Sequence, residues 1–252
     1  MKIGTLEHRD LFCRRFVESH VAFEPELLPW PQLEGELLAR LRSFPFWSYA
    51  RTIERRAGLM VTAFAQTLAD PVIRHAVALQ GYEETLHARI MQHVLDRYGI
   101  EAVELDLPPA PATRESFLVF GFGECRDSFL GFGAFALAEQ AEYFPRALLT
   151  VFERVLLEEA RHITFFVNWF RYEEARAGRD NFFARAFIEA RALLDATLQT
   201  TFNDRPQELA APGAGAPEDL AKFFPGLTPA RFLEIALDAN RRFMRGADPR
   251  LA

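Results

Sequence analysis

The sequence predicts an all-α protein, and three observations support this fold class. Long segments carry apolar residues at the three- and four-residue spacing of helices that bury one face. Proline or glycine marks several of their ends. Two segments also carry Glu-x-x-His, whose two side chains lie about one turn apart on one face of a helix. The pairs are Glu84 with His87 and Glu159 with His162; one such pair is common in charged helices, whereas two indicate a shared role.

The composition fits a soluble protein with a sizeable core. The chain has 252 residues, 50% of them hydrophobic, which suffices for one large domain or two small ones. A net charge of −6 gives no positive surface for nucleic acid or an anionic membrane. Cys13 and Cys125 form no CxxC motif and suit a reducing interior. No apolar run approaches the roughly 20 residues that span a bilayer, and the first residues lack the apolar segment of a signal peptide, so we expect a cytoplasmic protein without membrane contact.

Phenylalanine dominates the aromatic residues, with 25 copies against five tyrosines and three tryptophans. We expect most of these rings to pack the core. The alternative is an apolar cavity or tunnel, which phenylalanine lines without adding polar atoms.

Two short helices are expected before the long ones. Residues 8–22 form an amphipathic segment, and a proline-punctuated loop follows it. A second short helix is expected at 32–42, ending before Pro45. Neither segment carries an evident chemical motif.

The first pair of long helices is expected at 47–69 and 71–98. Pro71 separates them, because proline suits the first turn of a helix and disrupts its interior. Gly99 is the expected C-cap of the second helix. The apolar stripes of this pair carry three candidate site residues, namely Glu54, Glu84 and His87.

A proline-rich crossover at 101–113 leads to the second pair, expected at 114–142 and 145–177. Four glycines interrupt the third helix, and each costs a helix about 1 kcal/mol relative to alanine. A strand at 117–123 is the alternative there; we expect the helix, because glycine also lets backbones approach closely. The stripes of this pair carry Glu124, Glu159 and His162.

Two further helices are expected near the C-terminus, at 181–202 and 229–245. The segment 204–217 between them is rich in alanine, glycine and proline near its end. We expect it to be a connector, and a cover over the site is the alternative.

The two pairs of long helices look like two copies of one antiparallel hairpin. Glu54 precedes Glu84, and Glu124 precedes Glu159, by similar stretches of chain. At about 1.5 Å of rise per residue, such stretches let a helix run out, turn and return to the same level. The six candidate residues can therefore meet in one layer.

Four buried carboxylates would repel one another and could not all stay ionised unaided. Two divalent cations would supply the missing positive charge. A set of oxygen and imidazole ligands suits iron or manganese.

This pattern resembles the ferritin-like di-iron carboxylate superfamily, and in particular its oxidase and oxygenase members. One glutamate from each of two helices joins a Glu-x-x-His from each of the other two in such proteins. The resemblance covers 47–177 and implies an up-down four-helix bundle with a long crossover between the second and third helices. It implies a single domain that extends over 1–252. The bundle core of this domain would be 47–177, its N-terminal helices 8–44 and its C-terminal helices 180–246.

The resemblance also implies a role for each candidate residue. One metal would be held by Glu54, Glu84 and His87. The other would be held by Glu124, Glu159 and His162. Glu84 and Glu159 would bridge the two ions, which are expected to be iron, with manganese or a mixed pair as the alternative.

Three further acids lie beside these residues in the sequence. Asp127, one turn beyond Glu124, is a candidate hydrogen-bond partner of a ligand histidine. Glu83 and Glu158 directly precede the motif glutamates and are alternatives to them as ligands, but they point about 100° away from them. We expect Glu83 and Glu158 to be solvated.

Among members of this superfamily, the chain length, extra helices and apolar lining fit the oxidases and oxygenases best. Small residues expected beside the ligands, Gly58, Ser128 and Gly131, would leave room for O₂ and an apolar group. We therefore expect an O₂-dependent oxidoreductase that acts on a small, largely apolar substrate and takes electrons from an external donor. A homodimer is compatible with this organisation.

Two other classes of function stay open. The first is a metal-binding, ferroxidase-like or peroxide-detoxifying protein without an organic substrate, expected if no cavity adjoins the metals. The second is a helical interaction protein without metal, expected if Glu54 and Glu124 are exposed.

Overall fold

The computed structural model of the chain describes residues 1–44, 46–179 and 224–251, and all regular structure in them is helical, as predicted. The α-helices of this described part are α1 (Leu6–Glu18), α2 (Gly35–Arg42), α3 (Trp47–Thr67), α4 (Pro71–Tyr98), α5 (Arg114–Gln140), α6 (Arg146–Arg176) and α9 (Pro229–Phe243). Short 3₁₀ turns lie at η1 (Pro25–Leu27) and η4 (Met244–Gly246). In this part of the chain, no helix has the length and apolar character needed to cross a membrane.

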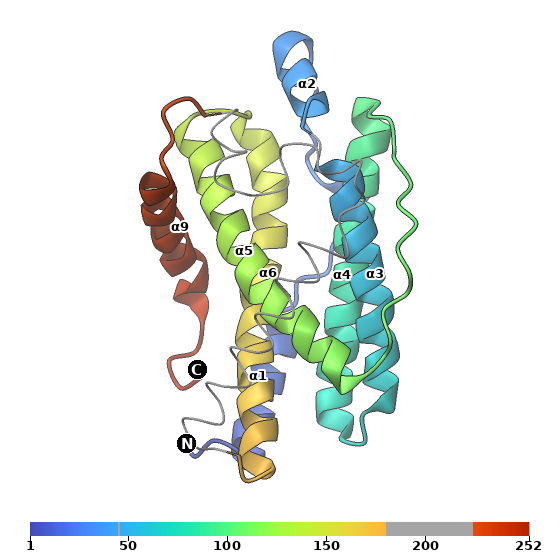
Figure 1. Ribbon diagram of the computed structural model, residues 1–252, viewed down its shortest axis with the longest axis vertical. Coiled ribbons are helices and arrows are strands. Elements are labelled where there is room, and N and C mark those ends of the chain that lie inside the picture. Colours follow the sequence, from blue (N-terminus) through green and yellow to red (C-terminus); the bar gives the residue numbers. More distant parts are fainter. Residues whose placement is uncertain (45, 180–223, 252) are drawn as a thin grey trace.

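The four long helices lie in two pairs, α3 with α4 and α5 with α6 (Figure 1). The pairs meet through contacts of α3 with α5 and of α4 with α6. Helix α1 packs against α6 and α4, and α9 packs along α5. The site described below lies where α3, α4, α5 and α6 come together.

The residues predicted to begin and to end the second long helix do so in α4. Pro71 occupies its first turn, and the Asp70 carboxylate accepts hydrogen bonds from the backbone N–H groups of Val72 and Ile73. Gly99 ends the helix with φ of 59°, a left-handed conformation that glycine adopts without steric cost. These caps fix the length of α4.

The N-terminal helices are shorter than predicted. Helix α1 begins at Leu6, where the Thr5 hydroxyl accepts a hydrogen bond from the backbone N–H of His8, and it ends at Glu18 rather than near residue 22. Helix α2 begins at Gly35 rather than near residue 32. The expected helix at 181–202 and the segment 204–217 lie outside the described residues. Helix α9 matches its prediction closely.

Helix α5 is continuous from Arg114 to Gln140, so the alternative strand at 117–123 is not formed. Its glycines serve close packing. A Cβ on Gly121 would lie 2.1 Å from Cδ2 of Phe166, and one on Gly133 would lie 2.7 Å from Cβ of Ala236 in α9. The glycines therefore let an aromatic ring and a second helix approach the α5 backbone.

Aromatic rings fill the core, as expected from the phenylalanine content. Phe64 and Phe117 stack with ring centroids 4.8 Å apart, and Trp169 meets Phe117 edge-on at 4.8 Å. The most deeply buried phenylalanines of the described residues are Phe12, Phe117, Phe132, Phe165, Phe166 and Phe170. Such interlocked rings position the long helices relative to one another.

Replacing Gly121 with alanine should lower the free energy of unfolding by about 1–3 kcal/mol, because the added methyl group would overlap the buried ring of Phe166. The matched control is Gly131→Ala in the same helix, where the nearest atom, Cδ2 of Leu156, is 3.9 Å from the added Cβ. The control should be neutral or stabilise the protein by up to about 1 kcal/mol. Chemical denaturation followed by circular dichroism measures both changes, and equal effects would contradict this account of α5.

Candidate metal centre

The six predicted side chains lie together in one layer contributed by four helices. They are Glu54 from α3, Glu84 and His87 from α4, Glu124 from α5, and Glu159 and His162 from α6. They form two groups of four that share Glu84 and Glu159, and the candidate ligand atoms within each group lie within 4.8 Å of one another. These Glu/His groups could hold metal ions.

The carboxylates at the edge of this layer are mostly buried. The side chain of Glu54 is 22% exposed and that of Glu124 is 19% exposed. The hypothesis of a metal-free interaction protein required both to be exposed, and the structure contradicts that condition.

The shared carboxylates each turn one oxygen toward each histidine. In Glu159, Oε1 lies 3.0 Å from Nδ1 of His87 and Oε2 lies 3.5 Å from Nδ1 of His162. In Glu84, Oε1 lies 3.0 Å from Nδ1 of His162 and Oε2 lies 3.8 Å from Nδ1 of His87. Both imidazoles therefore direct Nδ1 into the layer, between two carboxylates that span both groups.

Several polar atoms of this layer are buried without a hydrogen-bond partner among the described residues. They are Oε2 of Glu84, Glu124 and Glu159, and Nδ1 of His87 and His162. Buried polar atoms in folded proteins are nearly always satisfied, so a concentration of such atoms in one layer needs an explanation. Metal ions would supply the missing partner to all of them, and the donor set therefore fits a pair of divalent cations.

The pKa values in the layer reflect the cost of crowding acids in a buried place. Burial raises the pKa of Glu54, and the nearby carboxylates of Glu84 and Glu159 add to this effect, so that against the lowering effect of His87 the pKa is about 8. Burial, together with Glu159 and Glu84, also raises the pKa of Glu124 well above its usual range. Without a cation, protons therefore neutralise the outer acids of the layer.

The histidines neutralise the acid at the centre. Burial alone would raise the pKa of Glu159, but the close approach of the His162 and His87 imidazoles lowers it well below its usual range. Burial would likewise lower the pKa of His87, whereas Glu158, Glu159 and Glu54 raise it well above its usual range. The imidazoles thus carry positive charge in the metal-free layer.

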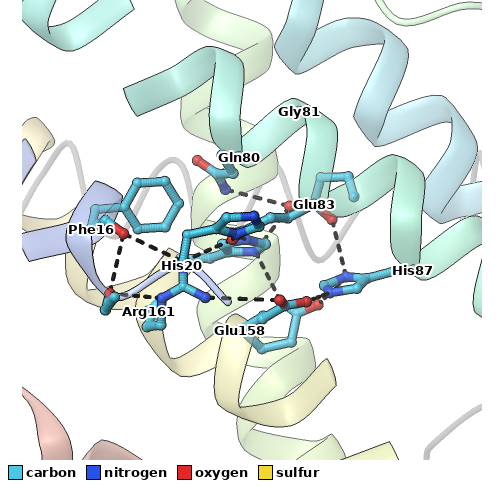
Figure 2. Close-up of polar contacts among 12 residues, drawn as sticks. Phe16, His20, Gln80, Gly81, Glu83, His87, Glu158 and Arg161 are labelled. Atoms are coloured by element: carbon cyan, nitrogen blue, oxygen red, sulfur yellow. Dashed lines mark hydrogen bonds and ion pairs between the residues drawn. The ribbon is translucent and has the colours of Figure 1, made fainter. Parts of the chain in front are cut away.

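Behind the layer, each histidine donates a hydrogen bond from Nε2 to a glutamate on the opposite helix. Nε2 of His87 lies 2.9 Å from Oε2 of Glu158 (Figure 2). Nε2 of His162 lies 2.8 Å from Oε2 of Glu83. A carboxylate that holds this ring nitrogen fixes the orientation and tautomer of a ligand histidine. With Nε2 protonated, Nδ1 is the nitrogen left for a metal.

The expectation that Glu83 and Glu158 are solvated is wrong, because these residues are 0% and 5% exposed. Their helices α4 and α6 contact each other, so the face beside each Glu-x-x-His looks toward the opposite histidine rather than toward water. The signal was present in the sequence, because the repeated motif is Glu-Glu-x-x-His in both helices.

Asp127 does not fill the predicted role. Its side chain is 57% exposed and pairs with neighbouring Arg126, and none of its described contacts is with a histidine. The site-facing stripe of α5 continues from Glu124 to Ser128, which is buried. Asp127 therefore lies to one side of that stripe, about 100° around the helix from Ser128.

Two basic side chains hold Glu83 in turn. Its Oε1 accepts a hydrogen bond from Arg161 at 2.8 Å and another from Nδ1 of His20 at 2.5 Å (Figure 2). Burial would raise the pKa of Glu83, but His162 and Arg161 lower it to about 2, so this carboxylate is ionised. His20, Glu83 and Glu158 form a third group of metal-ligand type, but imidazole and guanidinium groups already engage its carboxylates. No motif in the sequence pointed to His20.

Among the described residues of the layer, the two most exposed side chains lie at one edge. Glu54 and Glu124 retain partial exposure, whereas Glu84 and both histidines are fully buried. A cavity of about 410 Å³ lies nearby between α3 and the crossover, lined by residues that include Arg51, Arg55, Arg56, Leu59, Met60 and Leu107. None of the six cluster residues lines this cavity. Within the described part of the chain, the layer is therefore nearest to solvent at the edge formed by α3 and α5.

Comparison of the chain with models of protein families, with curated proteins and with solved structures finds no match. The geometry itself provides three carboxylates and one imidazole around each of two positions, with two carboxylates in common. Such oxygen and nitrogen donors suit divalent iron or manganese.

Metal binding should release protons at pH 7. Glu54 has a pKa of about 8 in the metal-free layer, so at pH 7 its carboxyl group is mostly protonated. A cation that binds there must displace this proton. The affinity for Mn(II) should therefore fall as the pH is lowered from 8 to 6. Isothermal titration calorimetry in buffers of different ionisation enthalpy measures the protons released. A binding heat that does not depend on the buffer at pH 7 would contradict the protonated state of the layer, and Glu54→Gln should release fewer protons than the unmodified chain.

Proposed function

We propose that this chain is a ferritin-like dinuclear metalloprotein that uses two iron ions and O₂ to oxidise a small, largely apolar substrate. The observation that carries the proposal is the placement of Glu84 and Glu159, each with one oxygen toward each histidine. This is the arrangement expected of carboxylates that bridge two ions.

The arrangement of the long helices supports the ferritin-like part of the proposal. Two helix pairs, α3 with α4 and α5 with α6, are joined by the non-helical crossover 101–113, and each pair supplies one glutamate and one Glu-x-x-His. That division of ligands among four helices is typical of ferritin-like di-iron and di-manganese sites.

Each residue then has a defined task. Glu54 with His87, and Glu124 with His162, would complete the two ends of the site. Bound iron would supply the redox chemistry with O₂. Glu83 and Glu158 hold the imidazoles in place by their hydrogen bonds to Nε2. The ring of Phe16, with its centroid 5.9 Å from that of His162, helps to exclude water from the α1 side.

A ferroxidase-like protein without an organic substrate is the second candidate, and two observations favour it. Gly58 was expected to leave room beside the ligands, but a Cβ there would lie 2.5 Å from Oγ1 of Thr85, so contact with α4 occupies that space. The 410 Å³ cavity also has no cluster residue in its lining. Gly131, whose nearest neighbour Leu156 is 3.9 Å from an added Cβ, is the more open position.

The double variant Glu159→Ala with His162→Ala should lose at least one of about two metal ions per chain while remaining helical. It removes one shared carboxylate and one imidazole, so neither position keeps its full set of ligands. Metal analysis after anaerobic loading with Fe(II), with circular dichroism for the fold, measures the outcome. The control is Glu153→Ala in the same helix, a glutamate that pairs with Arg146 and should leave the metal content unchanged. Unchanged metal content in the double variant would refute the site.

Oxygen consumption separates the two functions. A ferroxidase oxidises many added Fe(II) ions per chain without an organic substrate. An oxidase or oxygenase oxidises about two and then consumes further O₂ only when a reductant and a small apolar substrate are present. Loaded protein mixed with O₂ in an oxygen-electrode assay, with Fe(II) added in excess, distinguishes these results.

A further inference from the structure

The layer of candidate ligands is nearly symmetric, but the groups behind it are not. Oε1 of Glu83 accepts hydrogen bonds from His20 and Arg161, which leaves Oε2 for His162. Among the described residues, Oε1 of Glu158 accepts no hydrogen bond, and its ion pair with Arg161 is long, at 3.9 Å. Glu83 is thus held through both oxygens, whereas Glu158 is held mainly by the imidazole that it should orient.

The sequence explains the difference. The two copies of the motif are Glu83-Glu84-Thr85-Leu86-His87 and Glu158-Glu159-Ala160-Arg161-His162. Arg161 stands where the first copy has Leu86, a buried apolar residue. His20, from the segment that follows α1, lies within 4.8 Å of both carboxylates, but its described hydrogen bond goes to Glu83.

We propose that the two metal positions are inequivalent, and that His20 and Arg161 are positioning residues for the position at His162. The inference rests on the proposed metal site and adds that its two positions differ in metal affinity. His20 and Arg161 touch no candidate ligand atom in the contacts described above; they act through Glu83. The position that contains Glu124 and His162 should bind the first metal ion more tightly than the position that contains Glu54 and His87.

Two opposing effects decide whether His20 and Arg161 strengthen or weaken metal binding at the His162 position. Hydrogen bonds from His20 and Arg161 to Oε1 draw charge away from Oε2 of Glu83, which would weaken its support of His162. They also fix the carboxylate, so Oε2 and the imidazole are already oriented before a metal arrives. We expect orientation to dominate, because His20 and Arg161 bind Oε1 and leave the 2.8 Å bond from His162 to Oε2 intact. Loss of an outer partner of a ligand histidine typically costs about 10- to 100-fold in metal affinity.

A purely structural role for His20 makes a different prediction. His20 also forms a hydrogen bond with the buried carboxylate of Glu83, so its loss could lower stability without changing either metal position selectively. Metal affinity measured separately at each position distinguishes the two roles. His20→Asn provides a test of rescue, because an asparagine amide nitrogen can take a place close to that of Nδ1 and can donate to Glu83.

The experiment uses the full-length chain and Mn(II) as the probe, with calorimetry for affinity and electron paramagnetic resonance for bound metal. Glu54→Gln impairs the His87 position and leaves the His162 position; Glu124→Gln does the reverse. Adding His20→Ala should weaken Mn(II) binding about tenfold in the first background. In the second it should change binding less than twofold. His20→Asn should restore most of the loss, and His75→Ala, which removes an exposed histidine of α4, should change neither.

The possible outcomes separate the inference from the proposed function. Equal weakening in both backgrounds, or none in either, overturns the inequivalence while the dinuclear site stands. Absence of Mn(II) and Fe(II) binding by the unmodified chain overturns the proposed function itself. If either single variant loses both ions, the unmodified chain and His20→Ala are compared directly: only the tighter of two binding steps should weaken, and a change confined to the weaker step would refute the assignment.

Discussion

The burial of four carboxylates in one layer is the constraint on which the rest of the structure depends. An ionised carboxylate loses its hydration when it is buried, and like charges at close range make the loss worse. The chain reduces this cost in two ways that its own residues provide. Two imidazoles between the shared carboxylates lower the pKa of Glu159, and protons neutralise the outer acids, as the raised pKa of Glu54 indicates. Neither way gives partners to all the buried polar atoms of the layer, which is why a pair of cations is the natural complement.

The layer has two unlike sides, and this division follows from which helices cover it. On the α1 side, glutamates, Arg161, His20 and the ring of Phe16 surround the imidazoles and fix their orientation. On the side of α3 and α5, Glu54 and Glu124 keep partial contact with solvent. The residues that fix the orientation of the imidazoles are thus separated from the edge where a small molecule could approach. A site that binds metal firmly and still admits a reactant needs both properties at once.

Much of this arrangement could be predicted from the sequence, because it depends on spacing along single helices. Pro71 and Gly99 bound α4, and the interval within each Glu-x-x-His places both side chains on one face. The partners across helices could not be predicted in the same way. Periodicity tells which face a residue lies on, but not which helix lies opposite that face; Glu83 and Glu158 were therefore expected to be solvated, although they bind the histidines. Gly58 shows the same limit, since a small residue near a ligand can make room for a reactant or for a neighbouring helix.

The internal repeat explains both the symmetry of the site and its limits. Two similar hairpins place equivalent glutamates and histidines around a common centre, and this requires only that each copy keep its own spacing. The surroundings of the centre carry no such requirement, because each carboxylate behind a histidine can be held by whatever side chain reaches it. Arg161 in place of a second leucine, and His20 from outside the repeat, change one half without disturbing the ligand spacing of the other. Duplication can therefore set the geometry of two candidate metal positions, while single residues outside the candidate ligands give the two histidines different surroundings.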